Sequence, residues 1–195
     1  MAHVANDDPT SPVQRERRTR ILDTTIALAS QGGFDAVQMR AVAEQADVAL
    51  GTLYRYFPSK IHLLVSALAR EFERADATMA DNPVPGDTQA DRVNHVLNRL
   101  TRGLQDDQHL TEALTRAFMF ADRSARQEIQ GVGQLLVRML TRAMRPGEAA
   151  TDEDRAIARV IGDVWLAALM AWVNGRSSAE ETSAHMERAV RLVLR

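Results

Sequence analysis

Apolar residues recur at three- and four-residue spacings along almost the whole chain, and no segment alternates with the two-residue period of a strand. This pattern predicts amphipathic helices that each bury one face. Turn signals interrupt it at Gly32-Gly33, Asp47-Val48, Phe57-Pro58, the run 82–86 (NPVPG) and Arg145-Pro146-Gly147. Between these breaks we expect an all-α fold of about nine helices, at residues 12–32, 38–46, 49–56, 59–79, 88–105, 108–121, 124–144, 152–174 and 178–194.

Three of these expected helices begin with cap signatures, in which a Ser or Thr precedes an acceptor side chain by three residues. The pairs are Ser11 with Gln14, Thr151 with Asp154, and Ser178 with Glu181. Pro12 suits the first helical position, where its missing N–H costs nothing. Residues 1–10 are polar and aperiodic, which predicts a mobile tail.

The segment 38–60 matches a helix-turn-helix, since two short helices are joined by a turn of three to four residues. Its apolar residues, among them Val42, Ala46 and Leu53, can form the small core that fixes the angle between the helices. In this motif the second helix enters the major groove of DNA. Residues available to face DNA are Gly51, Thr52, Tyr54, Arg55, Tyr56 and Lys60.

Each of these residue types suits a particular contact. Arg55 can fork onto guanine O6 and N7, and Thr52 can reach a base edge. The hydroxyls of Tyr54 and Tyr56 suit phosphate oxygens, and Lys60 stands at a helix start, where backbone amides also favour an anion. The alternative is that the aromatic residues are core. We expect that for Phe57, whereas adjacency to Arg55 and Lys60 favours DNA contact for the tyrosines.

Composition narrows the function classes. The 195 residues carry 24 Lys+Arg against 26 Asp+Glu, a formal charge of −2, so a DNA-binding face must come from placement of cations. The basic residues Arg15, Arg17, Arg18 and Arg20 cluster at the start of the first helix, as a phosphate-binding or simply solvated face. The chain has no cysteine, which excludes disulfides, Cys-ligated metals and thiol catalysis.

Catalytic motifs are also missing from the sequence. We find no His-Glu-x-x-His, no Gly-rich phosphate loop, no Gly-x-Ser-x-Gly and no pair of Glu-x-x-His motifs. The sequence thus predicts no enzyme, no catalytic residues, no cofactor and no metal. No leader and no apolar run near the ~18 residues of a membrane helix are found, so we expect a cytoplasmic protein without membrane attachment.

The run from Phe34 to Lys60, and above all its end LYRYFPSK, resembles the signature of TetR-family transcriptional repressors. The resemblance implies a homodimer whose three N-terminal helices bind double-stranded DNA, while the other helices bind a small inducer and dimerise. It implies a DNA-binding domain at 11–58 and a ligand-binding and dimerisation domain at 59–195. Two positions depart from the family: Asp47 replaces the usual turn glycine, and Ala49 replaces a Ser or Thr cap.

A closer resemblance is to actinobacterial members that repress cholesterol-catabolism genes, carried by QRERRTRILD, LTEALTRAFMFAD and ARVIGDVWLAALMAW in addition to the helix-turn-helix. It implies a sterol-derived inducer, carried as a CoA thioester. The DNA-binding residues that we expect are Arg15, Arg18, Gln38, Arg40, Gly51, Thr52, Tyr54, Arg55, Tyr56 and Lys60.

Leucine and methionine stripes between residues 96 and 169 suit an apolar ligand pocket, although ordinary core would produce the same pattern. The expected pocket residues are Val96, Leu100, Leu114, Phe118, Met119, Leu136, Met139, Leu140, Trp165 and Leu169. The last two helices carry apolar faces that predict a dimer interface. The expected dimer residues are Trp172, Val173, Met186, Val190 and Val193.

Two alternatives stay open. One is a regulator of the same family that responds to another hydrophobic ligand, such as a fatty acyl-CoA or a drug removed by efflux. The other is a helical adaptor that binds only protein, for which Arg55→Ala would leave every activity intact. If the DNA-binding interpretation holds, the operator is a pseudo-palindrome, because a two-fold dimer presents two recognition helices.

Overall fold

The computed structural model describes residues 11–80 and 84–194, and this part of the chain holds nine α-helices and one short 3-10 helix, with no strand. The helices are α1 (Pro12–Ala36), α2 (Met39–Gln45), α3 (Leu50–Tyr56), α4 (Lys60–Ala80), α5 (Gln89–Gln105), α6 (Gln108–Phe120), α7 (Arg126–Met144), α8 (Asp152–Val173) and α9 (Ala179–Val193), and the 3-10 helix η1 spans Arg123–Ala125. The all-α prediction is therefore confirmed. The predicted tail 1–10 and part of the 82–86 loop lie outside the described residues.

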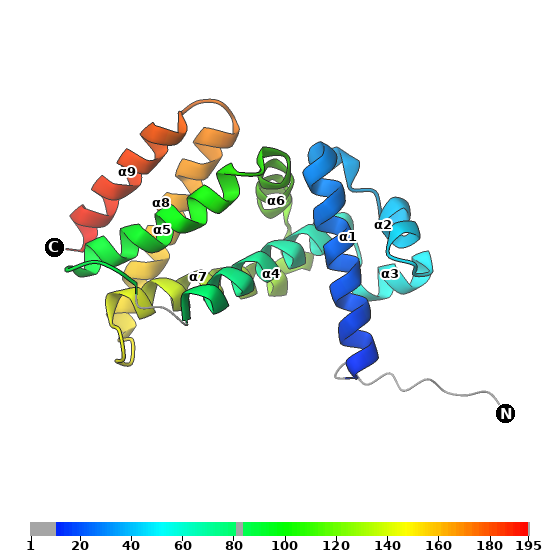
Figure 1. Ribbon diagram of the computed structural model, residues 1–195, viewed down its shortest axis with the longest axis horizontal. Helices are drawn as coiled ribbons and strands as arrows, with labels where there is room; N and C mark the ends of the chain where they lie inside the picture. The colour runs from blue at the N-terminus through cyan, green and yellow to red at the C-terminus, as the bar shows by residue number, and fades with distance from the viewer. Residues whose placement is uncertain (1–10, 81–83, 195) are drawn as a thin grey trace.

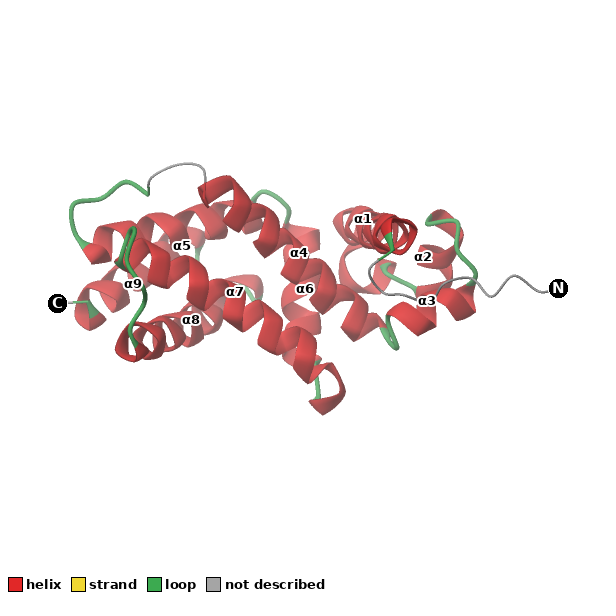
Figure 2. Cartoon of the chain, turned by 90° about the horizontal axis from the view of Figure 1, so that it is seen from below, coloured by secondary structure: helices red, strands yellow, loops and turns green. Residues whose placement is uncertain are grey.

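The molecule is elongated, with α1, α2 and α3 at one end and α5, α8 and α9 at the other (Figure 1). Seen from below, the two groups remain separate, and α4 and α6 lie between them (Figure 2). The long helix α4 extends from the three-helix unit to α7, and α6 packs along α1. Two helices, α4 and α6, thus connect the ends of the molecule.

The three-helix unit forms around a small apolar core. Ser11 caps α1 as expected, since its hydroxyl accepts a hydrogen bond of 3.3 Å from the backbone of Gln14. The predicted stop at Gly32-Gly33 is a break in helical geometry rather than the end of the element, because helical backbone resumes as far as Ala36. The residues that fill the core between the helices are buried: Ile21, Leu22, Thr25, Leu28, Ala29, Val42, Ala43, Ala46, Leu53 and Phe57.

Helix α4 is buried along its first half and fastened to α1 by Arg70. The Arg70 guanidinium donates to the Thr19 carbonyl at 2.9 Å and to Asp23 Oδ1 at 2.5 Å. The apolar side of α4 continues into the second unit, where Phe72 lies against Trp165 with ring centroids 6.0 Å apart. A displacement of α4 would therefore move both units.

The second unit begins its helices with strong caps. Capping boxes join Thr151 to Asp154 and Ser178 to Glu181, as the sequence predicts, and a further one joins Thr88 to Asp91. Such caps satisfy backbone N–H groups that a helix start leaves unpaired. The predicted helix 124–144 differs in its first turn, which is the 3-10 helix η1 with Asp122 as its cap.

Candidate DNA-binding face and ligand cavity

The turn between α2 and α3 has the geometry that the helix-turn-helix needs. Asp47 adopts a φ of 50°, a left-handed conformation that Asp tolerates better than most residues. The Val48 N–H then donates to the Ala43 carbonyl at 3.0 Å. Arg20 of α1 fastens this turn, since its Nε donates to the Ala46 carbonyl at 2.8 Å. Aspartate thus replaces the usual glycine without loss of the turn.

Helix α3 starts without a side-chain cap, because Ala49 offers none. Gly51 lies in its first turn on the surface, and a Cβ at that position would meet no atom within 4 Å. The packing of the subunit therefore does not require glycine there. A glycine that nothing inside the subunit requires fits a surface that another molecule approaches closely.

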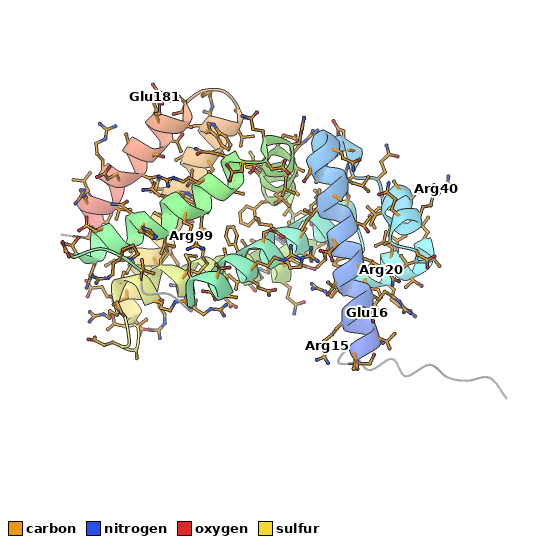
Figure 3. All side chains as sticks on the ribbon, in the orientation of Figure 1. Arg15, Glu16, Arg20, Arg40, Arg99 and Glu181 are labelled. Atoms are coloured by element: carbon orange, nitrogen blue, oxygen red, sulfur yellow. The ribbon has the colours of Figure 1, made fainter. Side chains whose placement is uncertain are left out.

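The predicted DNA-binding residues come from α1, α2, α3 and the start of α4, and most are open to solvent. Figure 3 shows Arg15 at the N-terminal end of α1 and Arg40 on α2, both at the periphery of the three-helix unit. The exposed residues are Arg15, Arg18, Gln38, Arg40, Gly51, Tyr54 and Arg55, and the half-buried ones are Thr52, Tyr56 and Lys60.

The sequence predicts a buried Phe57 and two tyrosines that face DNA, and the structure agrees with this only in part. Phe57 is buried, as expected, and Arg18 Cζ lies 5.6 Å from its ring centroid. Tyr54 is 46% exposed and free to reach a phosphate. Tyr56 instead packs against the core, with its ring centroid 6.3 Å from that of Phe57. Tyr56 is therefore less open to solvent than Tyr54.

Lys60 turns toward the protein rather than outward. Its ammonium donates to the Phe34 carbonyl at 2.8 Å and lies 3.9 Å from the Phe34 ring centroid. Burial lowers the pKa of Lys60 below its ordinary value of 10.5, an effect opposed by the Asp35 carboxylate and reinforced by Arg116. This lysine thus holds the end of α1 to the start of α4 in the DNA-free subunit, a role that the sequence did not indicate.

We call the group formed by Phe34, Lys60, Glu112 and Arg116 the Phe34 latch. The Phe34 N–H donates to Glu112 Oε2 at 2.8 Å, and Arg116 Cζ lies 4.5 Å from the Phe34 ring centroid. Arg116 also pairs with Asp35 at 3.5 Å and with Glu112 at 3.4 Å. The latch fastens the end of α1 to both α4 and α6.

Behind the latch, a cavity of about 850 Å³ opens among α4, α6, α7 and α8. Its volume falls within the roughly 300–1,000 Å³ of small-molecule sites. Apolar side chains form most of its wall, with Leu68 and Phe72 from α4 and the indole of Trp165 from α8. The Trp165 Nε1–H donates a hydrogen bond of 2.9 Å to Thr101 Oγ1, so the indole presents its apolar face to the cavity.

Five predicted ligand residues line this cavity: Leu114, Phe118, Leu136, Trp165 and Leu169. Four others do not line it, because they are buried in the packed core: Val96, Leu100, Met139 and Leu140. The tenth, Met119, is 49% exposed and borders a separate hollow between α6 and the end of α8. Four of the ten predicted pocket residues thus lie in ordinary core, the alternative that periodicity leaves open.

The cavity also has a charged part that the sequence interpretation missed. Arg138 on α7 and Arg155 and Arg159 on α8 line it, together with Asp163, so positive charge exceeds negative charge there. A signal existed in the sequence, since Arg155 and Arg159 are four residues apart and share a helix face. Within residues 11–80 and 84–194, no three His, Asp or Glu side chains come together to hold a metal ion.

Two predicted dimer residues are already covered within the subunit. Met186 and Val190 are 3% and 0% exposed, because this face of α9 packs against α5 and α8 within the subunit. Trp172 and Val173 are half-buried, and Val193 is 39% exposed. Other apolar side chains that the subunit leaves exposed include Val160 of α8 at 51%, Leu192 of α9 at 64% and Phe120 of α6 at 66%.

Helix α8 is long and apolar enough to cross a membrane by length and composition alone, although most of its apolar stretch is not buried in the subunit. The sequence expectation counted only uninterrupted apolar runs, and Arg159 and Asp163 interrupt this one. A single helix of this kind is weak evidence of membrane insertion. An apolar helix that the subunit leaves mostly unburied is also typical of a protein–protein interface.

The chain matches two family descriptions that together span most of its length. Residues 21–67 match bacterial regulatory proteins of the tetR family, and residues 86–193 match the tetracyclin repressor-like C-terminal domain. The first match contains the helix-turn-helix and the start of α4. The second contains α5 to α9 and most of the residues that line the cavity.

Known proteins resemble the chain over nearly its full length. It is 57% identical over 193 residues to the HTH-type transcriptional repressor KstR of Rhodococcus jostii (strain RHA1), covering 99% of this chain and 90% of the relative. A crystal structure of a TetR transcriptional regulator from Rhodococcus sp. RHA1 superposes with a TM-score of 0.86 at 31% identity, covering 93% and 97% of the two chains.

A more distant structure shares the fold. Thermus thermophilus FadR, a TetR-family transcriptional repressor in complex with lauroyl-CoA, superposes with a TM-score of 0.71 at 19% identity, covering 91% of this chain and 93% of that one. The full-length relative is named as a transcriptional repressor, and the helix-turn-helix supplies the DNA-binding module. The chain therefore belongs to the TetR family of bacterial transcriptional regulators, and it is a DNA-binding repressor rather than an enzyme.

Proposed function

We propose that the protein is a homodimer that binds a pseudo-palindromic operator and leaves it when a cholesterol-derived acyl-CoA thioester fills the cavity. The observation that carries the proposal is the 57% identity to a KstR repressor over 99% of the chain. The genes under its control would then serve sterol and lipid catabolism. Because its target is chromosomal DNA, the proposed site of action is the cytoplasm.

In DNA binding, the exposed residues of the three-helix unit would have different roles. Arg55 would pair with guanine O6 and N7, and Thr52 would contact a neighbouring base edge. Tyr54, Arg15 and Arg18 would bind phosphates and position the subunit without reading sequence. With a net charge of −2, the chain has no general attraction to DNA, so affinity depends on this face being presented twice.

The proposed dimer would form through the uncovered apolar surface of α8 and α9. Val160, Leu192 and Val193 are exposed there, and burying them in a second copy would remove an apolar patch from water. A two-fold axis through this surface would place the recognition helices at opposite ends of the dimer. Two such helices about 34 Å apart meet successive major grooves on one face of DNA.

The proposed inducer class rests on the chemistry of the residues that line the cavity. Leu68, Phe72 and Phe118 offer an apolar wall suited to a sterol or an acyl chain. Arg155 and Arg159 offer guanidinium groups, which match phosphate oxygens in geometry and charge. A CoA thioester combines an apolar acyl group with phosphates. The fold is shared with a FadR repressor that binds lauroyl-CoA, which makes a fatty acyl-CoA the second candidate.

Release from DNA would follow from movement of α4 and α6. Both helices line the cavity, and both contact the end of α1 through the Phe34 latch. A ligand that fits better when these helices spread apart shifts the dimer toward that arrangement and separates its recognition helices. A loss of operator affinity of about 100-fold needs roughly 2.7 kcal/mol of differential binding, within the usual range of allosteric coupling.

DNase footprinting on the DNA upstream of the protein's own gene tests the operator. We expect protection of two half-sites related by a two-fold axis, and purified dimer in sedimentation. Protection of a single half-site by a monomer, or failure to bind any such DNA at modest salt, would contradict the proposal.

Two glycines of α7 test the cavity. Gly133 lines it and Gly131 does not, and a Cβ at either position would meet no atom within 4 Å. We expect Gly133→Leu to weaken thioester binding without unfolding the protein, whereas Gly131→Leu should bind as the parent does. Equal binding by both variants, measured by calorimetry with stearoyl-CoA and with a steroid-acyl-CoA, would place the ligand elsewhere. Preference between the two thioesters decides between the sterol and fatty acyl candidates.

A further inference from the structure

A buried carboxylate ties α4 to α7. Asp76 of α4 is 8% exposed, and both of its oxygens face arginines of α7. Arg138 donates to Oδ2 through Nη2 at 2.7 Å and Nε at 3.1 Å, while Arg142 donates to Oδ1 at 2.6 Å. We call these three residues the Asp76 clamp. Figure 1 shows the two helices side by side at this point.

The two arginines of the clamp differ in one respect. Arg138 lines the cavity, and its side chain is 59% exposed. Arg142 is less exposed, at 36%, and does not line the cavity. The bonds that Arg138 makes within the described residues leave from Nε and Nη2, so its Nη1 is directed elsewhere. Only Arg138 can therefore serve both Asp76 and a molecule in the cavity.

The clamp carries more positive than negative charge. Two guanidinium groups face a single carboxylate, which leaves one positive charge unmatched within the cluster. Because a buried carboxylate is costly without its partners, Asp76 depends on this pairing. An anion that reaches Arg138 from the cavity would compete for the same guanidinium. A phosphate offers a bidentate acceptor of higher charge than the carboxylate.

We propose that Arg138 is a charge-sensing residue, shared between Asp76 and an anionic group of the inducer, so that ligand charge and not ligand shape alone loosens α4. This inference rests on the proposed function, since it concerns the same cavity. Binding of the anion draws Arg138 from Asp76 and releases the C-terminal half of α4. Since α4 begins at Lys60 in the Phe34 latch, the release reaches the DNA-binding unit.

Thermodynamic linkage determines in which direction a weakened Asp76 clamp changes ligand binding and operator binding. If the ligand weakens the Asp76 clamp, then weakening the clamp must strengthen ligand binding by the same factor. Asp76→Asn should thus bind the anionic ligand more tightly and bind the operator more weakly before any ligand is added. Arg138→Gln should lose the preference for an anionic ligand, since the competing guanidinium is gone.

The test compares two ligands that share an acyl group and differ in charge. Stearoyl-CoA carries the CoA phosphates, and the stearoyl thioester of N-acetylcysteamine is neutral; a steroid-acyl pair is tested in parallel. The quantity measured by calorimetry is the ratio of the two dissociation constants. We expect Arg138→Gln to reduce the preference for the CoA thioester by about tenfold, the scale of a lost hydrogen bond to a charged group. Arg99→Gln should keep the parental ratio within about twofold, because Arg99 is exposed on α5, does not line the cavity and makes no contact with Asp76.

The outcomes separate this inference from the function on which it rests. A parent protein that binds no thioester overturns both the inducer class and the inference. A parent that binds and responds, with Arg138→Gln retaining the full preference for the CoA thioester, overturns the inference alone. If Arg138→Gln does not fold, Asp76→Asn/Arg138→Gln removes the buried carboxylate that has lost one of its two partners, and its ratio is read in the same way.

Discussion

The backbone N–H of Phe34 donates a 2.8 Å hydrogen bond to Oε2 of Glu112, so the end of α1 is fastened directly to α6. The approach is close enough that a Cβ on Gly33 would lie 2.6 Å from the same oxygen. On its other face α6 carries Leu114 and Phe118 into the cavity. One helix therefore contacts both the cavity and the DNA-binding unit.

The close approach at Gly33 predicts a cost for any side chain there. Gly33 has a φ of 67°, where an L-residue is strained, and Ala would also collide with Glu112. We expect Gly33→Ala to lower the free energy of unfolding by roughly 1–3 kcal/mol, measured with urea. Gly103→Ala is the matched control, since Gly103 lies exposed in α5 with nothing within 4 Å. Equal stability of the two variants would contradict the strained, left-handed backbone at Gly33.

Gly51 separates folding from DNA binding. Because a Cβ there meets nothing inside the subunit, Gly51→Ala should stabilise α3 by about 0.5–1 kcal/mol, the usual gain for Gly to Ala in a helix. If DNA approaches this backbone, operator binding should weaken by about 1 kcal/mol or more. Melting and fluorescence anisotropy measure the two effects. Gly103→Ala should gain stability without losing operator affinity; an unchanged operator affinity in Gly51→Ala would mean that α3 does not enter the groove at this point.

Arg55 is the residue to which base reading is assigned. Arg55→Ala should cost about 1–3 kcal/mol of operator affinity and relax the preference at one base position in each half-site. Binding to operators mutated at single positions checks the second effect. Arg99, exposed on α5 in the other unit (Figure 3), supplies the control, since Arg99→Ala should bind the operator as the parent does. A uniform loss across all operator variants would reassign Arg55 to a phosphate.

The start of α8 predicts an acid-dependent part of stability. Hydrogen bonds from the Thr151 N–H and hydroxyl, with Arg145 beside them, lower the pKa of Asp154 below its ordinary value of 3.8. A lowered folded pKa contributes stability that is fully present above the unfolded value and is lost as pH falls through the folded one. Asp154→Asn should thus cost about 1–2 kcal/mol at pH 7 and progressively less below pH ~4. Thermal melts across that range test it; Asp152→Asn, which alters an exposed carboxylate of the same turn, should show no comparable loss.

Sequence signals that act between near neighbours allowed the helices and the three-helix DNA-binding unit to be predicted. Caps and turn residues act within three or four positions of one another, so Ser11, Asp47 and Thr151 could be interpreted without the fold. Phe57 could be assigned to the core because an aromatic side chain is ordinarily core, and it is buried in the structure. These features depend on neighbours that the sequence places side by side.

Long-range contacts could not be predicted in the same way. Lys60 turns inward because the carbonyl and the ring of Phe34 arrive from the end of α1. Periodicity showed that Met186 and Val190 share an apolar face, but not that α5 and α8 cover it within the subunit. The cavity lies where α7 and α8 leave space beside Gly133, and no helical period distinguishes such a wall from the packed core.

We propose that ligand in the cavity releases the protein from its operator. The operator dissociation constant tests this release when it is measured by fluorescence anisotropy with and without a saturating steroid-acyl-CoA thioester, and with stearoyl-CoA in a parallel titration. We expect a loss of operator affinity of about 100-fold with the steroid thioester. Operator affinity that stays the same while calorimetry shows the thioester bound would contradict it.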